Sequence, residues 1–306
     1  MKKDLLSLWD LSTYEIEHLV QRAFEYKDMR LKGQVYHPLK GKILALIFER
    51  PSTRTRVSFE VSMYHLGGEV IYMGTQETQL TRGEPLSDMA RVLSRYVDGM
   101  VVRCTTHTHL EELARYSGVP VINGLTDLYH PCQVLSDLVT IVERKGELRG
   151  LKIAWVGDGN NVAHSWINVA SMMGFHLHLA CPKDYEPRAD IIDRALEVAK
   201  GRIIVTHDPK EAVRGADIIY TDVWTSMGQE SEQQRRVRDF RDYQLNEVLL
   251  SYAKDDVMVM HCLPAHRGEE ITHEVIEGRH SVIFDQAENR LHLQKALLEM
   301  LLGGKV

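Results

Sequence analysis

Five consecutive residues, Ser52-Thr53-Arg54-Thr55-Arg56, combine three hydroxyl groups with two guanidinium groups. A helical pattern of apolar residues begins at Ser52, which places the five residues at a helix N-terminus. Unpaired N–H groups and the positive end of the helix dipole make such a terminus suited to binding anions. Arginine and hydroxyl donors fit a dianionic phosphate. An ordinary capped helix with solvated arginines is the alternative interpretation, because serine and threonine are common N-caps.

Further side chains that can bind or polarise a substrate come directly after predicted strands or at the start of predicted helices. They are Arg103, His130 with Gln133, Cys262 with Leu263, and Arg290, which is expected at a helix start. Taken singly, each is more often structural, since an isolated histidine or arginine is usually solvated or internally satisfied. Open parallel sheets bind ligands beyond the carboxyl ends of their strands. The repeated placement at such ends therefore indicates function rather than chance.

Alternating strand and helix patterns predict an α/β fold with parallel strands and right-handed crossovers. Strands are expected at 42–48, 69–73, 98–104 and 119–124, and then at 152–158, 176–182, 202–208, 217–224, 257–264 and 281–286. Helices are expected between them, with a last helix at about 288–302. The polar segment 146–150 is the expected boundary. It divides the chain into domains of residues 1–146 and 147–286, each a parallel β-sheet flanked by helices.

The composition is that of an ordinary folded protein, with 44% hydrophobic and 26% charged residues among 306. The formal net charge of −6 argues against a general nucleic-acid binder. The longest clean apolar run, 43–48, is far shorter than the about 20 residues of a membrane-spanning helix. The four cysteines are widely spaced, so neither a disulfide framework nor a structural zinc site is expected. We expect a cytoplasmic protein that needs no metal and no organic cofactor.

Four motifs, in order along the chain, resemble the aspartate/ornithine carbamoyltransferase family. They are FERPSTRTRVSFE (48–60), HPCQ (130–133), DVWTSMG (222–228) and HCLP (261–264). STRTR and HPxQ are specific to the family, and DxxxSMG with HCLP resembles its ornithine branch. The resemblance implies that a carbamoyl group passes from carbamoyl phosphate to L-ornithine, giving L-citrulline and phosphate. It also implies that the C-terminal helix, 287–306, packs back on the first domain, and that the protein is a homotrimer or a multiple of trimers.

The resemblance also implies roles for individual positions. Carbamoyl phosphate would be bound by Ser52, Thr53, Arg54, Thr55, Gln79, Arg103, His130, Gln133, Cys262, Leu263 and Arg290. Gln79 would be the residue that a neighbouring subunit lends to the site. Ornithine would be bound by Asn161, Asp222, Ser226 and Met227. Catalysis would depend on Arg103, His130, Asp222 and Cys262.

The expected chemistry is attack of a neutral amine on the carbamoyl carbon. A free alkyl ammonium has a pKa of about 10.4, so the site must favour its deprotonation. The clustered positive charges of Arg54, Arg103 and Arg290 would act in that direction. Charge that develops on the carbonyl oxygen would be stabilised by donors from His130, Arg103 and Thr55.

Several alternatives remain open at this stage. The turn GDGNN (157–161) after a strand suggests an NAD-dependent dehydrogenase, but the third glycine of that fingerprint is replaced by Val162. A non-catalytic phosphate-ligand binding protein would keep the anion site without needing Cys262 and Asp222. Within the family, putrescine, acetylated ornithine or aspartate would be other acceptors. Cys262 is either a functional thiolate or a small apolar residue at a strand end. Arg56 lies one turn deeper in its helix, and we expect it to form a structural ion pair.

Overall fold

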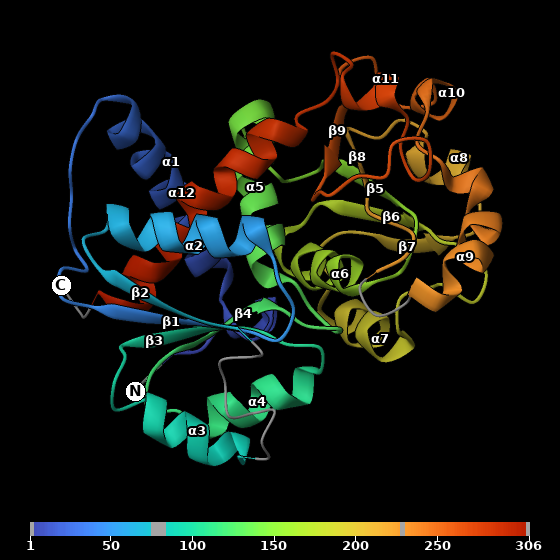
Figure 1. The fold of residues 1–306 in the computed structure, drawn as a ribbon. Coiled ribbons are helices and arrows are strands. Elements are labelled where there is room, and N and C mark those ends of the chain that lie inside the picture. The colour runs from blue at the N-terminus through green and yellow to red at the C-terminus, as the bar shows by residue number, and fades with distance from the viewer. Residues whose placement is uncertain (1–2, 75–83, 227–229, 304–306) are drawn as a thin grey trace. The chain divides into compact units, whose positions relative to one another are not determined.

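The computed structural model describes residues 3–74, 84–226 and 230–303. The chain forms two compact units, Met1–Val139 with Glu288–Val306, and Thr140–Ala287. Each unit contains one parallel β-sheet flanked by helices, as the sequence predicts (Figure 1). Among the described residues, we find no helix with the length and apolarity that a membrane crossing requires.

Unit 1, the first of these, has a four-stranded sheet in the order β2-β1-β3-β4. Its strands are β1 (Ile43–Phe48), β2 (Glu69–Gly74), β3 (Gly99–Arg103) and β4 (Val121–Leu125). Its helices are α1 (Thr13–Leu31), α2 (Thr53–His65), α3 (Leu86–Leu93) and α4 (His107–Tyr116), with most of α5 (Pro131–Lys145) and of α12 (Ile283–Leu302). Helices α3 and α4 cover one face of the sheet, and α1 and α2 lie on the other (Figure 1). Because both faces are covered, the central strands β1 and β3 are almost continuously apolar.

The strands of unit 1 end level with one another. Phe48, the last residue of β1, pairs with Gly74 of β2 and with Arg103 of β3. Arg103 in turn pairs with Leu125, the last residue of β4. The segments that follow β1, β3 and β4 therefore begin at one edge of this sheet.

Unit 2 has a five-stranded parallel sheet in the order β7-β6-β5-β8-β9. Its strands are β5 (Lys152–Val156), β6 (His176–Ala180), β7 (Ile203–Thr206), β8 (Ile218–Thr221) and β9 (Met258–His261). Its helices are α6 (Asn161–Met173), α7 (Ala189–Val198), α8 (Pro209–Val213), α9 (Gln233–Asp239), α10 (Glu247–Leu250) and α11 (His273–Ile276). An apolar cluster that includes Val156, Ile219, Val259, Phe240 and Val275 joins the sheet to the later helices.

The C-terminal helix packs against the first unit, which confirms that prediction. Arg22 of α1 donates from Nε and Nη2 to the two carboxylate oxygens of Glu299, at 2.7 and 2.9 Å. Ser62 of α2 donates from Oγ to the carbonyl oxygen of Leu291, at 3.1 Å. Helix α12 is thus tied by side chains to both α1 and α2.

The expected strand at 281–286 is wrong. Ser281 forms a single isolated bridge with Val259, and α12 then begins at Ile283, earlier than expected. The buried side chain of Gln286 explains the helix. It accepts from the backbone N–H of His261 at 2.9 Å and donates to the hydroxyl of Tyr220 at 3.0 Å. These tertiary bonds override the strand that the short apolar run 282–284 suggests.

Candidate active site

The run predicted to bind phosphate, 52–56, opens a helix, as expected. Ser52 is the N-cap of α2, and its hydroxyl accepts from the backbone N–H of Thr55 at 3.4 Å. Thr53 and Arg54 are exposed, whereas Thr55 is buried. The helix N-terminus therefore presents one arginine to solvent and turns one hydroxyl inward.

Arg56 forms the structural ion pair expected for it. Its Nε lies 2.9 Å from Oε1 of Glu60, one turn further along α2. Its guanidinium carbon also lies 3.7 Å from the ring centroid of Tyr72 on β2. The group is held against the protein surface rather than offered to a ligand.

A buried chain of hydrogen bonds links α2, α5 and α12. Arg290 donates from Nη2 to the hydroxyl of Thr55 at 3.1 Å and from Nη1 to Oε1 of Gln133. Gln133 in turn donates from Nε2 to Oδ1 of Asp137 at 2.8 Å. Arg290 was expected at a helix start, and that expectation is wrong because α12 already begins at Ile283. It nevertheless reaches the predicted phosphate-binding residues.

A short turn positions His130 directly before α5. The backbone N–H of Thr126 donates to the carbonyl of Tyr129 at 3.0 Å, and the Thr126 hydroxyl accepts from the N–H of Tyr129 at 3.2 Å. The carbonyl of His130 then accepts from the N–H of Gln133 at 3.2 Å, which begins the helix. The backbone of His130 is therefore fixed by hydrogen bonds on both sides.

His130 is surrounded by positive charge. Its side chain is only 6% exposed, and burial is the main reason that its pKa lies well below 6.5. The charges of Arg290, Arg103 and Arg54 lower the pKa further, in that order. The imidazole is accordingly neutral at neutral pH, so it keeps one N–H donor and adds no charge to the arginine cluster.

Arg103 ends β3 at an irregularity in the sheet. The pairing with β4 shifts register between Val102 and Arg103, so Arg103 lies opposite Leu125. Such bulges redirect a side chain at a strand end. The Arg103 side chain is buried, and its carbonyl accepts from the N–H of Glu49 at 2.8 Å. Ser52, Thr55, Arg103, His130 and Gln133 thus lie at the carboxyl edge of the unit 1 sheet, where the sequence predicted them. Arg290 joins them from the interior of α12.

Two predicted residues meet at the corresponding edge of unit 2. Thr221, the last residue of β8, pairs with His261, the last residue of β9. Asp222 and Cys262 follow directly on these two strands, so the register brings them side by side. The thiol of Cys262 donates to Oδ1 of Asp222 at 3.0 Å, and that oxygen also accepts from the N–H of Val223 at 2.8 Å.

Asn160 completes this group and was missed from the sequence. Its Nδ2 donates to Oδ2 of Asp222 at 2.8 Å. Its Oδ1 caps α6 by accepting from the N–H groups of Val162 and Ala163, at 2.9 and 3.2 Å. An asparagine before a helix signals a cap, but nothing in the local sequence indicates its second bond to a residue 62 positions away. The neighbouring Asn161, which was predicted to bind ornithine, is the partly exposed first residue of α6.

The two glycines of the GDGNN turn have backbone reasons to be glycine. Gly157 has a φ of 137°, a conformation that other residues rarely adopt. A Cβ on Gly159 would lie 2.2 Å from the backbone nitrogen of Pro187. A tight turn and a close chain approach therefore account for the motif without a dinucleotide.

Asp158, in the same turn, forms a buried ion pair. Its Oδ2 lies 3.0 Å from Nη1 of Arg236, which also donates to the carbonyl of Trp224 at 2.8 Å. Burial raises the pKa of Asp158 to about 6, and the charge of Arg236 opposes that rise. The negative charge of Asp222 acts in the same direction as burial, which shows that the two carboxylates interact.

A group of possible metal ligands includes Asp222, His261 and Cys262, whose ligand atoms lie within 4.8 Å of one another. Both ring nitrogens of His261 are engaged, however. Nδ1 accepts from the N–H of Leu263 at 2.8 Å, and Nε2 contacts Oε1 of Glu270 at 2.9 Å. A metal ion would have to displace one of these bonds.

Ser226 is partly exposed, and Gln79 and Met227 lie outside the described residues.

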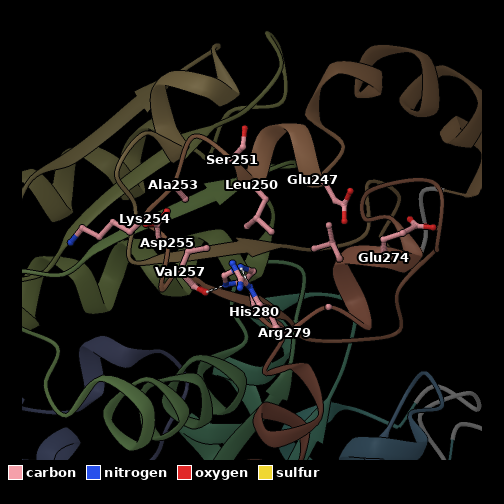
Figure 2. Close-up of a pocket in the computed structure, with 12 residues that line it drawn as sticks. Glu247, Leu250, Ser251, Ala253, Lys254, Asp255, Val257, Glu274, Arg279 and His280 are labelled. Atoms are coloured by element: carbon pink, nitrogen blue, oxygen red, sulfur yellow. Dashed lines mark hydrogen bonds between the residues drawn. The ribbon is translucent and has the colours of Figure 1, made fainter.

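A pocket on unit 2 shares no residue with the predicted sites (Figure 2). The bond drawn in Figure 2 joins Nδ1 of His280 to the carbonyl of Val257, at 3.0 Å. The pocket is lined by Glu247, Leu250, Ser251, Ala253, Lys254, Asp255, Val257, Glu274, Val275, Gly278, Arg279 and His280. The candidate site is therefore defined by the convergence of side chains at strand ends rather than by this hollow.

Two family models match the chain. Residues 3–143 match "Aspartate/ornithine carbamoyltransferase, carbamoyl-P binding domain", and residues 149–301 match "Aspartate/ornithine carbamoyltransferase, Asp/Orn binding domain". Among similar proteins, the ornithine carbamoyltransferase of Syntrophus aciditrophicus is 56% identical, over 99% of this chain and 100% of that one. That of Archaeoglobus fulgidus is also 56% identical, over 98% of each chain.

Solved structures agree with the sequence comparisons. The ornithine carbamoyltransferase of Pyrococcus furiosus superimposes with a TM-score of 0.96 at 50% identity, covering 100% of this chain and 98% of that one. The ornithine transcarbamoylase of Giardia lamblia has a TM-score of 0.90 at 33% identity, with 100% of both chains covered. The similarity therefore extends over the full described fold.

Proposed function

Because the chain belongs to the aspartate/ornithine carbamoyltransferase family, we propose that it transfers the carbamoyl group of carbamoyl phosphate to the side-chain amine of L-ornithine. The products are L-citrulline and phosphate. The observation that carries the proposal is the cluster around His130, a buried neutral imidazole under the combined charge of Arg54, Arg103 and Arg290. Such a cluster suits a small dianion that also carries a carbonyl group.

Carbamoyl phosphate binds to unit 1 in this proposal. Ser52, Thr53, Arg54 and Thr55 hold the phosphate at the N-terminus of α2, where N–H groups and the helix dipole favour an anion. The remaining unit 1 ligands are Arg103, His130, Gln133 and Arg290, with Gln79 supplied by a neighbouring subunit. Support comes from the buried bonds of Arg290 to Thr55 and Gln133, which prearrange three of these groups.

The carbonyl oxygen of the carbamoyl group gains negative charge as the amine attacks. A neutral His130 donates one N–H to that oxygen, and Arg103 and Thr55 supply further donors. Fixed donors of this kind act without reorganisation, and removing one typically costs roughly 3–4 kcal/mol of transition-state stabilisation. The lone pair of the amine forms the new C–N bond, and the bond between the carbamoyl carbon and the phosphate oxygen breaks. Phosphate leaves with the electron pair and accepts the proton that the amine nitrogen loses.

Ornithine binds to unit 2 in this proposal, through Asn161, Asp222, Ser226 and Met227. The Asp222 carboxylate, held by Asn160 and Val223, accepts a hydrogen bond from the amino group of the substrate. Cys262 is directly beside it. As a thiolate, its sulfur orients the side-chain amine of the substrate and helps to deprotonate the ammonium form. Leu263 lines the reacting centre. No metal or organic cofactor takes part.

The same proposal covers the division of the chain and its assembly. Residues 1–146 with 287–306 form the carbamoyl-phosphate domain, and residues 147–286 form the ornithine domain. The protein works in the cytoplasm as a homotrimer or a multiple of trimers, and its four cysteines, which are free thiols in the structure, are compatible with a reducing compartment. Light scattering after gel filtration would measure the assembly, and a monomer would contradict it.

The deciding experiment is a citrulline assay with alternative acceptors. The protein is mixed with carbamoyl phosphate and, in parallel, with L-ornithine, acetylated ornithine, putrescine or aspartate. We expect L-ornithine to give the highest kcat/KM. Faster carbamoylation of another amine would reassign the acceptor, and no product with any amine would exclude transferase activity.

A further inference from the structure

Glu270 is a fully buried carboxylate that holds both ends of the loop after β9. Its side chain is 0% exposed. Its Oε1 accepts from Nε2 of His261 at 2.9 Å and from the backbone N–H of His266 at 2.7 Å. The loop between these two histidines carries Cys262 and Leu263, so one oxygen atom anchors it at its first and last residues.

His261 transmits this constraint to the loop backbone. Its Nδ1 accepts from the N–H of Leu263 at 2.8 Å, and a nitrogen that accepts carries no proton. The ring proton is therefore on Nε2, where it is donated to Glu270. The backbone N–H of His261 is fixed separately by Gln286, at 2.9 Å.

The loop conformation needs such a constraint. Leu263 has a φ of 57°, in the left-handed region that leucine rarely adopts. Strained conformations of this kind persist when the surrounding structure determines them. The N–H of Leu263 donates to the His261 side chain rather than to a neighbouring strand. This bond holds only while the His261 proton stays on Nε2.

We propose that Glu270 is a positioning residue for the transferase reaction, because it fixes the tautomer of His261 and thereby the placement of Cys262 and Leu263. This inference rests on the proposed function, in which Cys262 and Leu263 line the reacting centre. A ring nitrogen of His261 lies within 4.8 Å of both the Cys262 sulfur and an Asp222 oxygen, so movement of the ring would disturb both. Glu270 itself contacts neither substrate.

The geometry makes it possible to test whether Glu270 acts as a hydrogen-bond acceptor or through its negative charge. Both donors converge on Oε1, while Oε2 of Glu270 is buried and makes no hydrogen bond within the described chain. Glu270→Gln can therefore keep both bonds through its amide oxygen, whereas the similarly sized Glu270→Leu loses both. The adjacent Glu269, which is partly exposed and lies 3.5 Å from Nδ1 of His266, provides a matched control as Glu269→Gln.

Steady-state kinetics of the full-length variants test the inference. We expect Glu270→Leu to lower kcat/KM for ornithine on the order of 10²-fold, the scale of a displacement of about 1 Å at a reacting group. The affinity for carbamoyl phosphate should fall much less, by no more than about fivefold, because all of its proposed ligands except Cys262 and Leu263 are on unit 1. Glu270→Gln should recover most of the lost activity, and Glu269→Gln should match wild type.

Two further results decide the question independently. In a His261→Gln background, Glu270→Leu should add little, because Glu270 acts through His261; independent, multiplicative losses would overturn the inference. Nitrogen NMR of wild-type protein labelled at histidine should show His261 protonated on Nε2, and a proton on Nδ1 would overturn it even if Glu270→Leu fails to fold. A wild-type protein that forms no citrulline would refute the proposed function instead, while the tautomer would still be measurable.

Discussion

Replacing Asp222 by asparagine turns one carboxylate oxygen into an NH2 group. The hydrogen bonds of both oxygens are known from the structure. In the wild type, Oδ1 of Asp222 accepts from Val223 and Cys262, and Oδ2 accepts from Nδ2 of Asn160 at 2.8 Å. In Asp222→Asn, the amide oxygen can keep the first two donors. The new NH2 group then faces the NH2 group of Asn160, so two donors meet where a donor and an acceptor met before.

The Asn160 amide cannot turn over without a further loss. Its Oδ1 caps α6 by accepting from Val162 and Ala163, and turning the amide would present NH2 to these N–H groups. A lost hydrogen bond to a charged acceptor costs about 1.5–3 kcal/mol, and a lost N-cap costs about 1 kcal/mol. Because Asn160 loses either the bond to position 222 or the cap, we expect Asp222→Asn to lower the free energy of unfolding by about 1–3 kcal/mol.

Urea denaturation tests this prediction. It is applied to Asp222→Asn and to a double variant, the exchanged pair, in which positions 160 and 222 exchange their side chains. In the double variant Asn160→Asp with Asp222→Asn, the carboxylate at position 160 caps α6 with one oxygen and accepts from the new amide with the other. Stability should return to within about 1 kcal/mol of wild type. Citrulline formation should stay low in both variants, because the carboxylate no longer stands beside Cys262, while carbamoyl-phosphate affinity should be unchanged.

The reasoning has two points of failure. If Asp222→Asn unfolds at the same urea concentration as wild type, the bond from Asn160 contributes nothing. If the exchanged pair is no more stable than the single variant, the opposition of two donors is not the cause of the loss. Recovery of full ornithine turnover in the exchanged pair would remove Asp222 from the catalytic assignment.

Three further predictions concern charged groups. Arg54→Ala should weaken carbamoyl-phosphate binding in calorimetry by about 10- to 100-fold, the scale of a charge-assisted hydrogen bond, and an unchanged affinity would remove it from the phosphate site. Arg56→Ala should leave that affinity within about twofold, since Arg56 is paired with Glu60 at the surface; a loss as large as that of Arg54→Ala would contradict the separation of the two arginines. Burial raises the pKa of Asp158 to about 6 despite Arg236, so the folded state gains stability when Asp158 is protonated and loses it as pH rises through about 6. Relative to Asp158→Asn, wild-type stability in urea should fall by up to about 3 kcal/mol between pH 4 and 7, and parallel pH profiles of the two proteins would refute this.

The local sequence predicted the features that depend on local physics. A buried parallel strand is a continuous apolar run, so 42–48 and 98–104 could be recognised as β1 and β3. Ser52 was recognisable because N-caps have few residue types. Ligands collect at the carboxyl ends of parallel strands, and the level ends of β1, β3 and β4 bring the predicted phosphate ligands to one edge.

The features that were missed depend on bonds between distant parts of the chain. Asn160 bonds to Asp222 across 62 positions, and no local periodicity indicates that bond. Arg290 was predicted as a site residue, but its bond to Thr55, across 235 positions, was not. The segment 281–286 contains a short apolar run that suggests a strand, but α12 begins at Ile283 and is held there by the bonds of Gln286. Short helices such as α10, which is capped by Asn246 through the N–H of Leu249, contain too few residues for a helical period to appear.

The position of Arg290 on the last helix has a consequence for how the protein is made. Unit 1 begins at the first residues, yet one of its buried arginines is contributed by α12, after the whole of unit 2. During synthesis, Thr55 and Gln133 emerge from the ribosome long before their partner exists. A nascent or truncated chain that ends before α12 would lack one cation of the proposed phosphate cluster, so we expect its carbamoyl-phosphate affinity to depend on whether α12 has been made.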